Sequence, residues 1–102
     1  MQAFAGPLSV AMKPPPGFSE LCQGLHQDAL LLAQGSLERL ASDCVGFVRS
    51  EHRADLTRFL AEALEKQTPA ELKGHLNRQK PEIIMQSAAA VAFLEYAFKR
   101  LD

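Results

Sequence analysis

Apolar residues recur every three or four positions along most of the chain, which is the spacing that places them on one face of an α-helix. No stretch of useful length alternates apolar and polar residues as a β-strand would, and no Asn-Gly or Asp-Gly hairpin signal occurs. The sequence therefore predicts an all-α fold, a compact bundle of about five helices. The expected helices span residues 18–34, 37–50, 51–66, 69–77 and 81–98.

Some of these helices carry recognisable end signals. Thr68-Pro69-Ala70-Glu71 is the strongest, because the threonine can cap the helix, the proline suits its first position and the glutamate can return a hydrogen bond. Ser36 can cap the second helix, and the glycine that precedes it can end the first. The last helix is apolar nearly all the way round, so we expect it to lie deepest in the fold.

The N-terminal residues form a region of their own. Residues 1–17 are expected to be an arm followed by a proline-rich spacer, and residues 18–102 to be the helical domain. Lys13-Pro14-Pro15-Pro16-Gly17 is predicted to be non-helical, because proline fixes φ, lacks an amide donor and restricts the residue before it. The expected anchors of the arm are Phe4, Leu8 and Val10.

Composition and charge narrow the classes of partner. Eleven basic and twelve acidic residues leave a formal charge of −1, so we expect no direct binding to nucleic acid. The chain lacks both a long apolar stretch and the basic start of an export signal, so no membrane span or export is expected. Cys22 and Cys44 fit no metal or redox spacing and are expected to be reduced core residues of a cytoplasmic protein.

Histidines and thiols are the candidates for chemistry. His26, His52 and His75 lie on different predicted helices and match no compact spacing for metal ligands. Cys22 and His26 are four residues apart, as a thiol and its base could be on a helix, yet no loop suited to an oxyanion hole accompanies them. We therefore predict no metal, no cofactor and no catalytic residue.

His26 and Asp28 border the most apolar segment of the chain. Residues two apart point to different sides of a helix, so a shared metal would need ligands from other helices. We expect the two side chains to form a structural motif, a hydrogen-bonded pair at a helix end or between helices.

A solvated basic face is expected from Lys66, Lys73, Arg78 and Lys80. Phe93 is expected in the core, and the place of Tyr96 is left open.

Several short elements resemble a known family. The first are Phe18-Ser19-Glu20-Leu21, Leu25-His26-Gln27-Asp28 and Gly35-Ser36-Leu37-Glu38. Leu56-x-x-Phe59-Leu60-x-x-x-Leu64 and Thr68-Pro69-Ala70-Glu71-Leu72 follow. Together they resemble the small helical immunity proteins of bacterial contact-dependent growth inhibition systems, over roughly residues 18–76. Leu25 and Ala29 stand where that family often has aromatic residues.

The resemblance implies a cytoplasmic, non-enzymatic protein that binds the toxic C-terminal domain of a cognate effector, frequently a nuclease, and blocks it. For a cationic toxin, acidic side chains of the second and third helices are the candidate binding residues, since carboxylates can replace substrate phosphates. These candidates are Asp43, Glu51, Asp55, Glu62 and Glu65.

Two other functions stay open at this point. A helical adaptor or oligomerisation module would accept a partner helix in an apolar groove. A small enzyme would be built on His26, Asp28 and Cys22. The leading hypothesis expects a monomer or a weak dimer when the protein is free.

Overall fold

The computed structural model describes residues 12–101, and every regular element in that range is helical. This confirms the predicted all-α fold, with five α-helices of seven residues or more. In order, the elements are α2 (Pro16–Cys22), α3 (Ala29–Leu32), α4 (Leu37–Val45), η1 (Ser50–His52), α5 (Arg53–Lys66), α6 (Pro69–Arg78) and α7 (Ser87–Leu101). The predicted anchors Phe4, Leu8 and Val10 lie outside the described residues.

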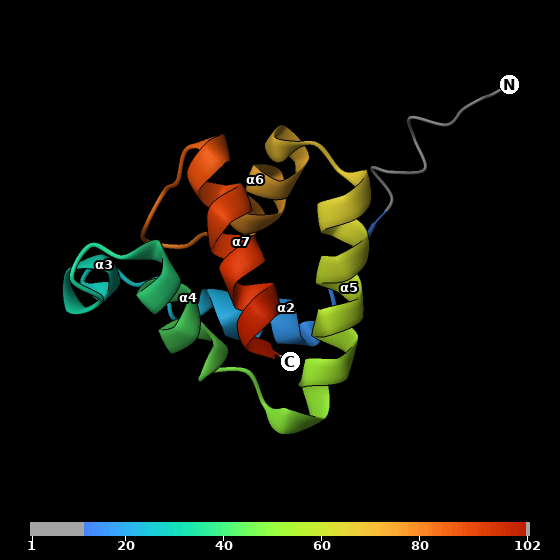
Figure 1. The fold of residues 1–102 in the computed structure, drawn as a ribbon, viewed down its shortest axis with the longest axis horizontal. Coiled ribbons are helices and arrows are strands. Elements are labelled where there is room, and N and C mark those ends of the chain that lie inside the picture. Colours follow the sequence, from blue (N-terminus) through green and yellow to red (C-terminus); the bar gives the residue numbers. More distant parts are fainter. Residues whose placement is uncertain (1–11, 102) are drawn as a thin grey trace, which may run out of the picture.

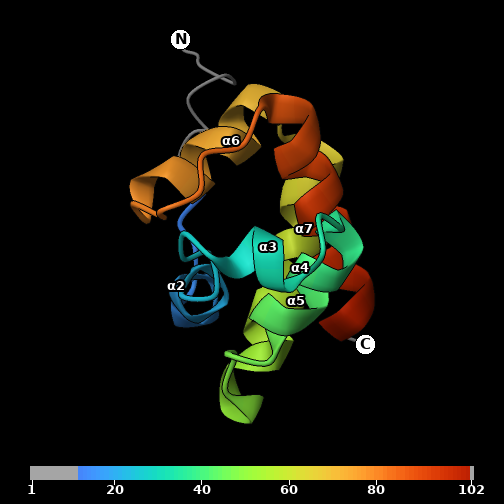
Figure 2. The ribbon, with the colours of Figure 1, turned by 90° about the vertical axis from the view of Figure 1, so that its left-hand side faces the viewer.

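Helix α7 is the central element of the fold (Figure 1). It packs against α4, α5 and α6, and α4 and α5 lie on opposite sides of it (Figures 1 and 2). Its buried face includes Phe93 and Leu94, with alanines at 90 and 97 that let neighbouring helices approach. The other face is open to solvent at Ala88, Glu95 and Lys99, so the predicted deepest helix is central but not enclosed.

A cluster of rings joins α2 to α5 and α6. Phe18 is fully buried, and its ring makes edge-to-face contacts with those of Phe59 and His75. The centroid of the Phe18 ring is 5.5 Å from that of Phe59 and 6.2 Å from that of His75. The Phe59 and His75 rings are also 5.5 Å apart and nearly perpendicular. Edge-to-face contacts of this kind add to the gain from burying the rings, so the cluster fixes how α2 crosses the other helices.

The predicted helix over residues 18–34 is wrong, because the structure breaks it into α2 and the single turn α3. The break follows from the position of Gly24, which lies directly on Cys44. A Cβ at residue 24 would be 2.6 Å from the Cys44 sulfur and 3.0 Å from its Cα. The chain leaves the helical path after Cys22 and makes this contact. Leu32, which a helix over residues 18–34 would place on the same face as Leu25 and Ala29, is 66% exposed.

The proline-rich segment is shorter than predicted, because Pro16 and Gly17 belong to the first turn of α2. A proline is tolerated there, since the first amides of a helix have no partner within it. Gly17 lies close to α5: a Cβ on it would be 3.0 Å from the carbonyl oxygen of His52 and 3.2 Å from the Cβ of Leu56. The first helix thus begins at Pro16, before the predicted start at residue 18.

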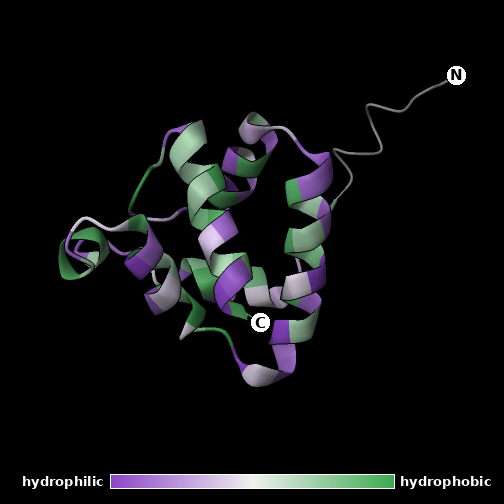
Figure 3. Ribbon diagram, in the orientation of Figure 1, coloured by the Kyte–Doolittle hydropathy of each residue, from purple (hydrophilic) through white to green (hydrophobic). Residues whose placement is uncertain are grey.

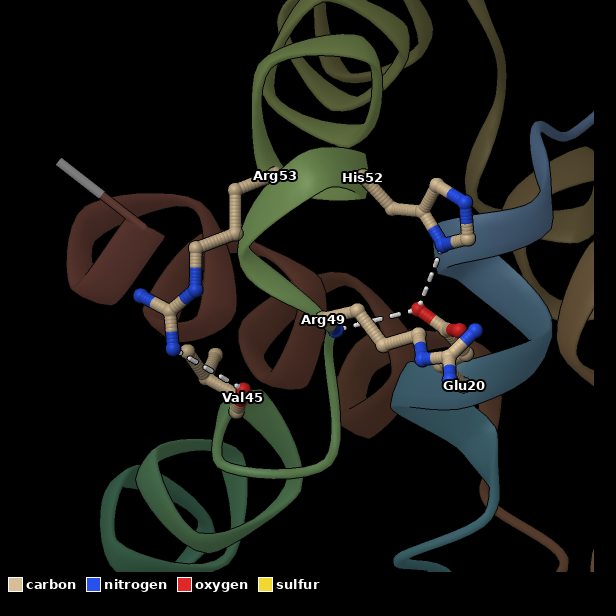
Figure 4. Close-up of polar contacts among 5 residues, drawn as sticks. All are labelled: Glu20, Val45, Arg49, His52 and Arg53. Atoms are coloured by element: carbon tan, nitrogen blue, oxygen red, sulfur yellow. Dashed lines mark hydrogen bonds and ion pairs between the residues drawn. The ribbon is translucent and has the colours of Figure 1, made fainter.

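The second predicted helix ends at Val45 rather than Ser50, and Glu20 of α2 holds the connection that follows (Figure 4). The Glu20 Oε1 accepts the backbone N–H of Arg49 at 3.1 Å and lies 2.9 Å from the Nδ1 of His52. The hydrogen bond from His52 lowers the pKa of the Glu20 carboxyl below its ordinary value, although burial opposes this shift. The guanidinium of Arg53 donates to the carbonyl of Val45 at 3.3 Å.

The capped helix α6 confirms its sequence signal. The Thr68 Oγ1 accepts the N–H of Glu71 at 3.2 Å, and the Glu71 Oε1 accepts the N–H of Thr68 at 2.8 Å.

The last predicted helix starts later than expected, at Ser87, because residues 82–86 lie in a non-helical segment. Lys80 begins the departure from helical geometry with a left-handed φ of 55°. Within residues 12–101, no helix has the length and apolar character needed to cross a membrane.

Replacing Gly24 with alanine should destabilise the fold by about 1–3 kcal/mol, because the new methyl group would collide with Cys44. Gly74→Ala is the matched control, since the nearest atom to a Cβ there is the flexible tip of Arg78 at 3.5 Å. In the interior of α6 the control should stabilise by up to about 1 kcal/mol. Urea unfolding measures both, and equal effects of the two substitutions would contradict the account of the break.

Candidate functional site

The His26-Gln27-Asp28 segment forms the turn between α2 and α3, and Glu82 holds this turn by two hydrogen bonds. The N–H of Glu82 donates to the carbonyl of Leu25 at 3.0 Å. The Oε1 of Glu82 accepts the N–H of Gln27 at 2.9 Å, across 55 positions of sequence. We call these two hydrogen bonds the Glu82 clamp. They join the turn before α3 to the segment that leads into α7.

Both segments that the clamp joins carry large aliphatic side chains that are exposed to solvent. Leu31 is 78% exposed, Leu32 66% and Ile84 78%. The chain near α3 and the segment entering α7 lie on one side of the molecule, which faces the viewer in Figure 2, and both are coloured as hydrophobic in Figure 3. We call Leu31, Leu32 and Ile84 the apolar surface. Apolar side chains exposed on one side of a molecule make that side a candidate for binding.

The backbone explains why these side chains point outward. Ala29 and Ala33 are buried, and their four-residue spacing turns one side of the α3 turn toward the core. The leucines between them therefore face solvent. In the non-helical segment before α7, Met85 is buried while its neighbour Ile84 is exposed.

The side chains of His26 and Asp28 do not form the predicted pair. Within residues 12–101, neither makes a side-chain hydrogen bond. His26 is half-buried and lines a small cleft with Gln23, Gln79 and Lys80, whereas Asp28 is exposed. Both contribute through the backbone, because the carbonyl of His26 accepts the N–H of Ala29 and that of Asp28 accepts the N–H of Leu32.

The five candidate carboxylates are all exposed but do not share one surface. Asp43 lies on α4 and Glu51 in η1, whereas Asp55, Glu62 and Glu65 lie on α5, which is across α7 from α4. Two of the α5 carboxylates have cations beside them: Asp55 pairs with Arg58, and Glu62 with Lys66 at 3.1 Å. The carboxylates therefore do not combine into a single anionic face.

His75, considered from the sequence only as a possible metal ligand, is a buried polar residue of α6. It is 2% exposed, and both ring nitrogens have partners. The Nε2 lies 2.8 Å from the Oε1 of Gln67, and the Nδ1 lies 2.9 Å from a guanidinium nitrogen of Arg78. Arg78 can only donate, so the geometry assigns the proton to Nε2. The spacing of His75 with Leu72 and Leu76 is the signal in the sequence that could have placed it on the buried face of α6.

The surroundings of His75 keep its ring neutral. Burial lowers the pKa of the imidazole below its ordinary value, the charge of Arg78 lowers it further, and Glu71 acts in the opposite direction. A cleft beside the ring is lined by the same residues together with Ala70 and Gly74. With both nitrogens engaged, the ring serves the packing of α6 rather than proton transfer.

The two cysteines are free and buried, as predicted for core residues. Burial raises the pKa of each thiol to about 12. Both are therefore protonated at pH 7, and Cys22 lacks the thiolate that a nucleophilic cysteine needs. Among the described residues, no group of three or more His, Cys, Asp or Glu side chains could hold a metal ion.

Comparisons of the chain with protein-family models, with curated proteins and with solved structures find no match. The site must therefore be judged on its own geometry. Among the described residues, its outward-facing feature is the apolar surface, on the two segments that the clamp joins.

The lowered pKa of His75 predicts a fold that weakens in mild acid. The unfolded chain takes up a proton at this residue near pH 6.5, more readily than the folded chain does. The neutral His75 ring therefore contributes fully to the free energy of unfolding above pH 6.5. This contribution is lost as the pH falls toward the pKa of His75 in the folded protein. We expect His75→Gln, which cannot titrate, to flatten the fall in unfolding free energy between pH 7.5 and 5. Identical pH profiles for the two proteins would contradict this assignment.

Proposed function

We propose that this protein acts by binding a protein partner through the apolar surface, and not by catalysing a reaction. The observation that carries the proposal is that Leu31 and Ile84, each 78% exposed, stand on two segments that the Glu82 clamp joins. Covering such side chains gains about 25 cal/mol for each Å² of apolar area removed from water. Among residues 12–101 these side chains are left in solvent, so the gain is available to a partner that covers them.

The residues around the apolar surface suit an interface rim. Gln27, Asp28, Gln34 and Gln86 are exposed polar residues close in sequence to the exposed leucines or to Ile84. Protein interfaces commonly place aliphatic or aromatic side chains at the centre and polar groups at the edge, where they exclude water and set specificity. The surface thus offers both parts of such an interface.

The partner that we propose is the toxic C-terminal domain of a contact-dependent growth inhibition effector, which makes this chain a cytoplasmic immunity protein. Support comes from the resemblance over residues 18–76, whose His26-Gln27-Asp28 element is the turn that the clamp holds. Inhibition would follow from covering the toxin's active cleft or the path of its substrate. A standard interface of about 1,600 Å² would be enough for a stable complex.

The second candidate is an oligomerisation module, and the same exposed leucines favour it. In a two-fold dimer a surface meets its own copy, so aliphatic side chains on both copies would be covered together. Sedimentation equilibrium of the purified chain separates the two functions. A dimer that is stable at low micromolar concentration and is lost in Leu31→Ser supports oligomerisation, and a monomer removes it.

Leu31→Ser and Ile84→Ser should each raise the Kd for the toxin domain encoded directly upstream, by roughly 10- to 100-fold. The reason is that a fully buried aliphatic side chain contributes about 1.5–3 kcal/mol. Titration calorimetry with a catalytically inactivated toxin domain measures the effect. Because both residues are exposed, the midpoint of thermal unfolding should stay within a few degrees of the wild type.

Phe47→Ser is the matched control, since Phe47 is also an exposed apolar residue, at 49%, and the nine residues of α4 separate it from α3. Its affinity should equal that of the wild type. Loss of affinity in Phe47→Ser alone, or on reversing the charges of Asp55 and Glu62, would move the interface away from the apolar surface. Absence of binding by the wild type, with no protection in a toxin assay, would end the immunity proposal.

A further inference from the structure

We infer that Glu82 is a positioning residue, whose clamp sets the placement of α3 relative to Ile84 before a partner arrives. The inference rests on the proposed function, because it concerns the surface through which the partner is bound. It goes further in assigning a role to a polar residue outside the apolar surface. The role follows from the contacts of Glu82 and from the weakness of the two segments that it joins.

Neither segment is long enough to hold its own geometry. α3 has four residues, a single turn, and its N-cap residue Asp28 makes no side-chain capping bond. One helical turn is unfavourable alone, since it fixes several backbone dihedrals for very few hydrogen bonds. The segment at Ile83, Ile84 and Met85 is non-helical, and within residues 12–101 its backbone takes part in no hydrogen bond.

The clamp supplies the missing restraint from both directions. The main chain of Glu82 fixes residue 82 to Leu25, at the start of the turn. Its carboxylate then reaches the N–H of Gln27, two residues nearer to α3. Among the described residues Glu82 forms no ion pair, so its side-chain hydrogen bond is made to this backbone amide. Two bonds at neighbouring positions restrain both the distance and the orientation of the segments.

A preassembled surface binds more tightly than one assembled on contact. Ordering a loop at an interface costs free energy that is subtracted from the affinity. The clamp orders these segments during folding, so less ordering remains to be done on binding. Leu31, Leu32 and Ile84 are then already in place when the partner arrives. Loosening the clamp should therefore lower the association rate and the affinity while leaving the contacting side chains unchanged.

Glu82→Ala and Glu82→Gln together test this role. Alanine removes the acceptor for the Gln27 amide, whereas glutamine keeps an amide oxygen in its place. For the toxin domain we expect a roughly fivefold weaker affinity with alanine, the equivalent of one hydrogen bond, and an affinity within about twofold of the wild type with glutamine. Glu95→Ala, which removes an exposed carboxylate from α7, is the matched control and should leave the affinity unchanged.

Measurements on the free protein separate the clamp from the proposed function. Amide exchange by NMR should be faster at Gln27 in Glu82→Ala and near the wild-type rate in Glu82→Gln, with the core amides of α7 protected equally in all three proteins. Equal exchange at Gln27 in all three would overturn the clamp, even if the wild type failed to bind the toxin domain. Wild-type binding with unchanged affinity in Glu82→Ala would overturn the positioning role and leave the proposed function standing.

Discussion

The contact between Gly24 and Cys44 is the constraint on which the outward face of this protein depends. A side chain at residue 24 would come within 2.6 Å of the Cys44 sulfur, so only a glycine lets the chain lie directly on α4. The contact ends α2 and sends the chain into the turn at residues 26–28. The following turn of helix then buries only two alanines, and the leucines between them face solvent.

The polar groups inside the fold serve the packing of the helices. His75 links Gln67 and Arg78 while its ring packs against two phenylalanines. Glu20 holds the connection between α4 and α5 through the backbone of Arg49 and the ring of His52. Buried polar groups are costly unless they are paired, so these contacts make the arrangement of α2, α5 and α6 specific. The proposed binding surface lies elsewhere, on the exposed aliphatic side chains Leu31, Leu32 and Ile84.

The parts of the fold that local signals determine are predictable from the sequence. α5 and α6 matched their predicted ranges closely, because helical spacing and the capping box of Thr68 act within a few residues. The helix over 18–34 could not be rejected in the same way, since the break depends on a tertiary contact of Gly24. Ile84 was placed in a helix for a similar reason: the bond from Glu82 to Leu25 is invisible to periodicity.

The same limit applies to the candidate site. Acidic residues counted along the chain predicted an anionic surface, but the count ignored both the position of α7 between α4 and α5 and the cations beside Asp55 and Glu62. The apolar surface escaped detection because leucines next to Asp28 read as core until the break in the helix is known. His75, by contrast, was detectable from its spacing with two leucines of α6.

The most direct test of the central claim is a methyl NMR titration of the protein with the inactivated toxin domain encoded beside it. The account predicts that the methyl signals of Leu31, Leu32 and Ile84 shift or broaden strongly on binding, while those of leucines in the interior of α5 remain in place. A complex that forms without perturbing these three residues would contradict the claim that the fold displays them for recognition.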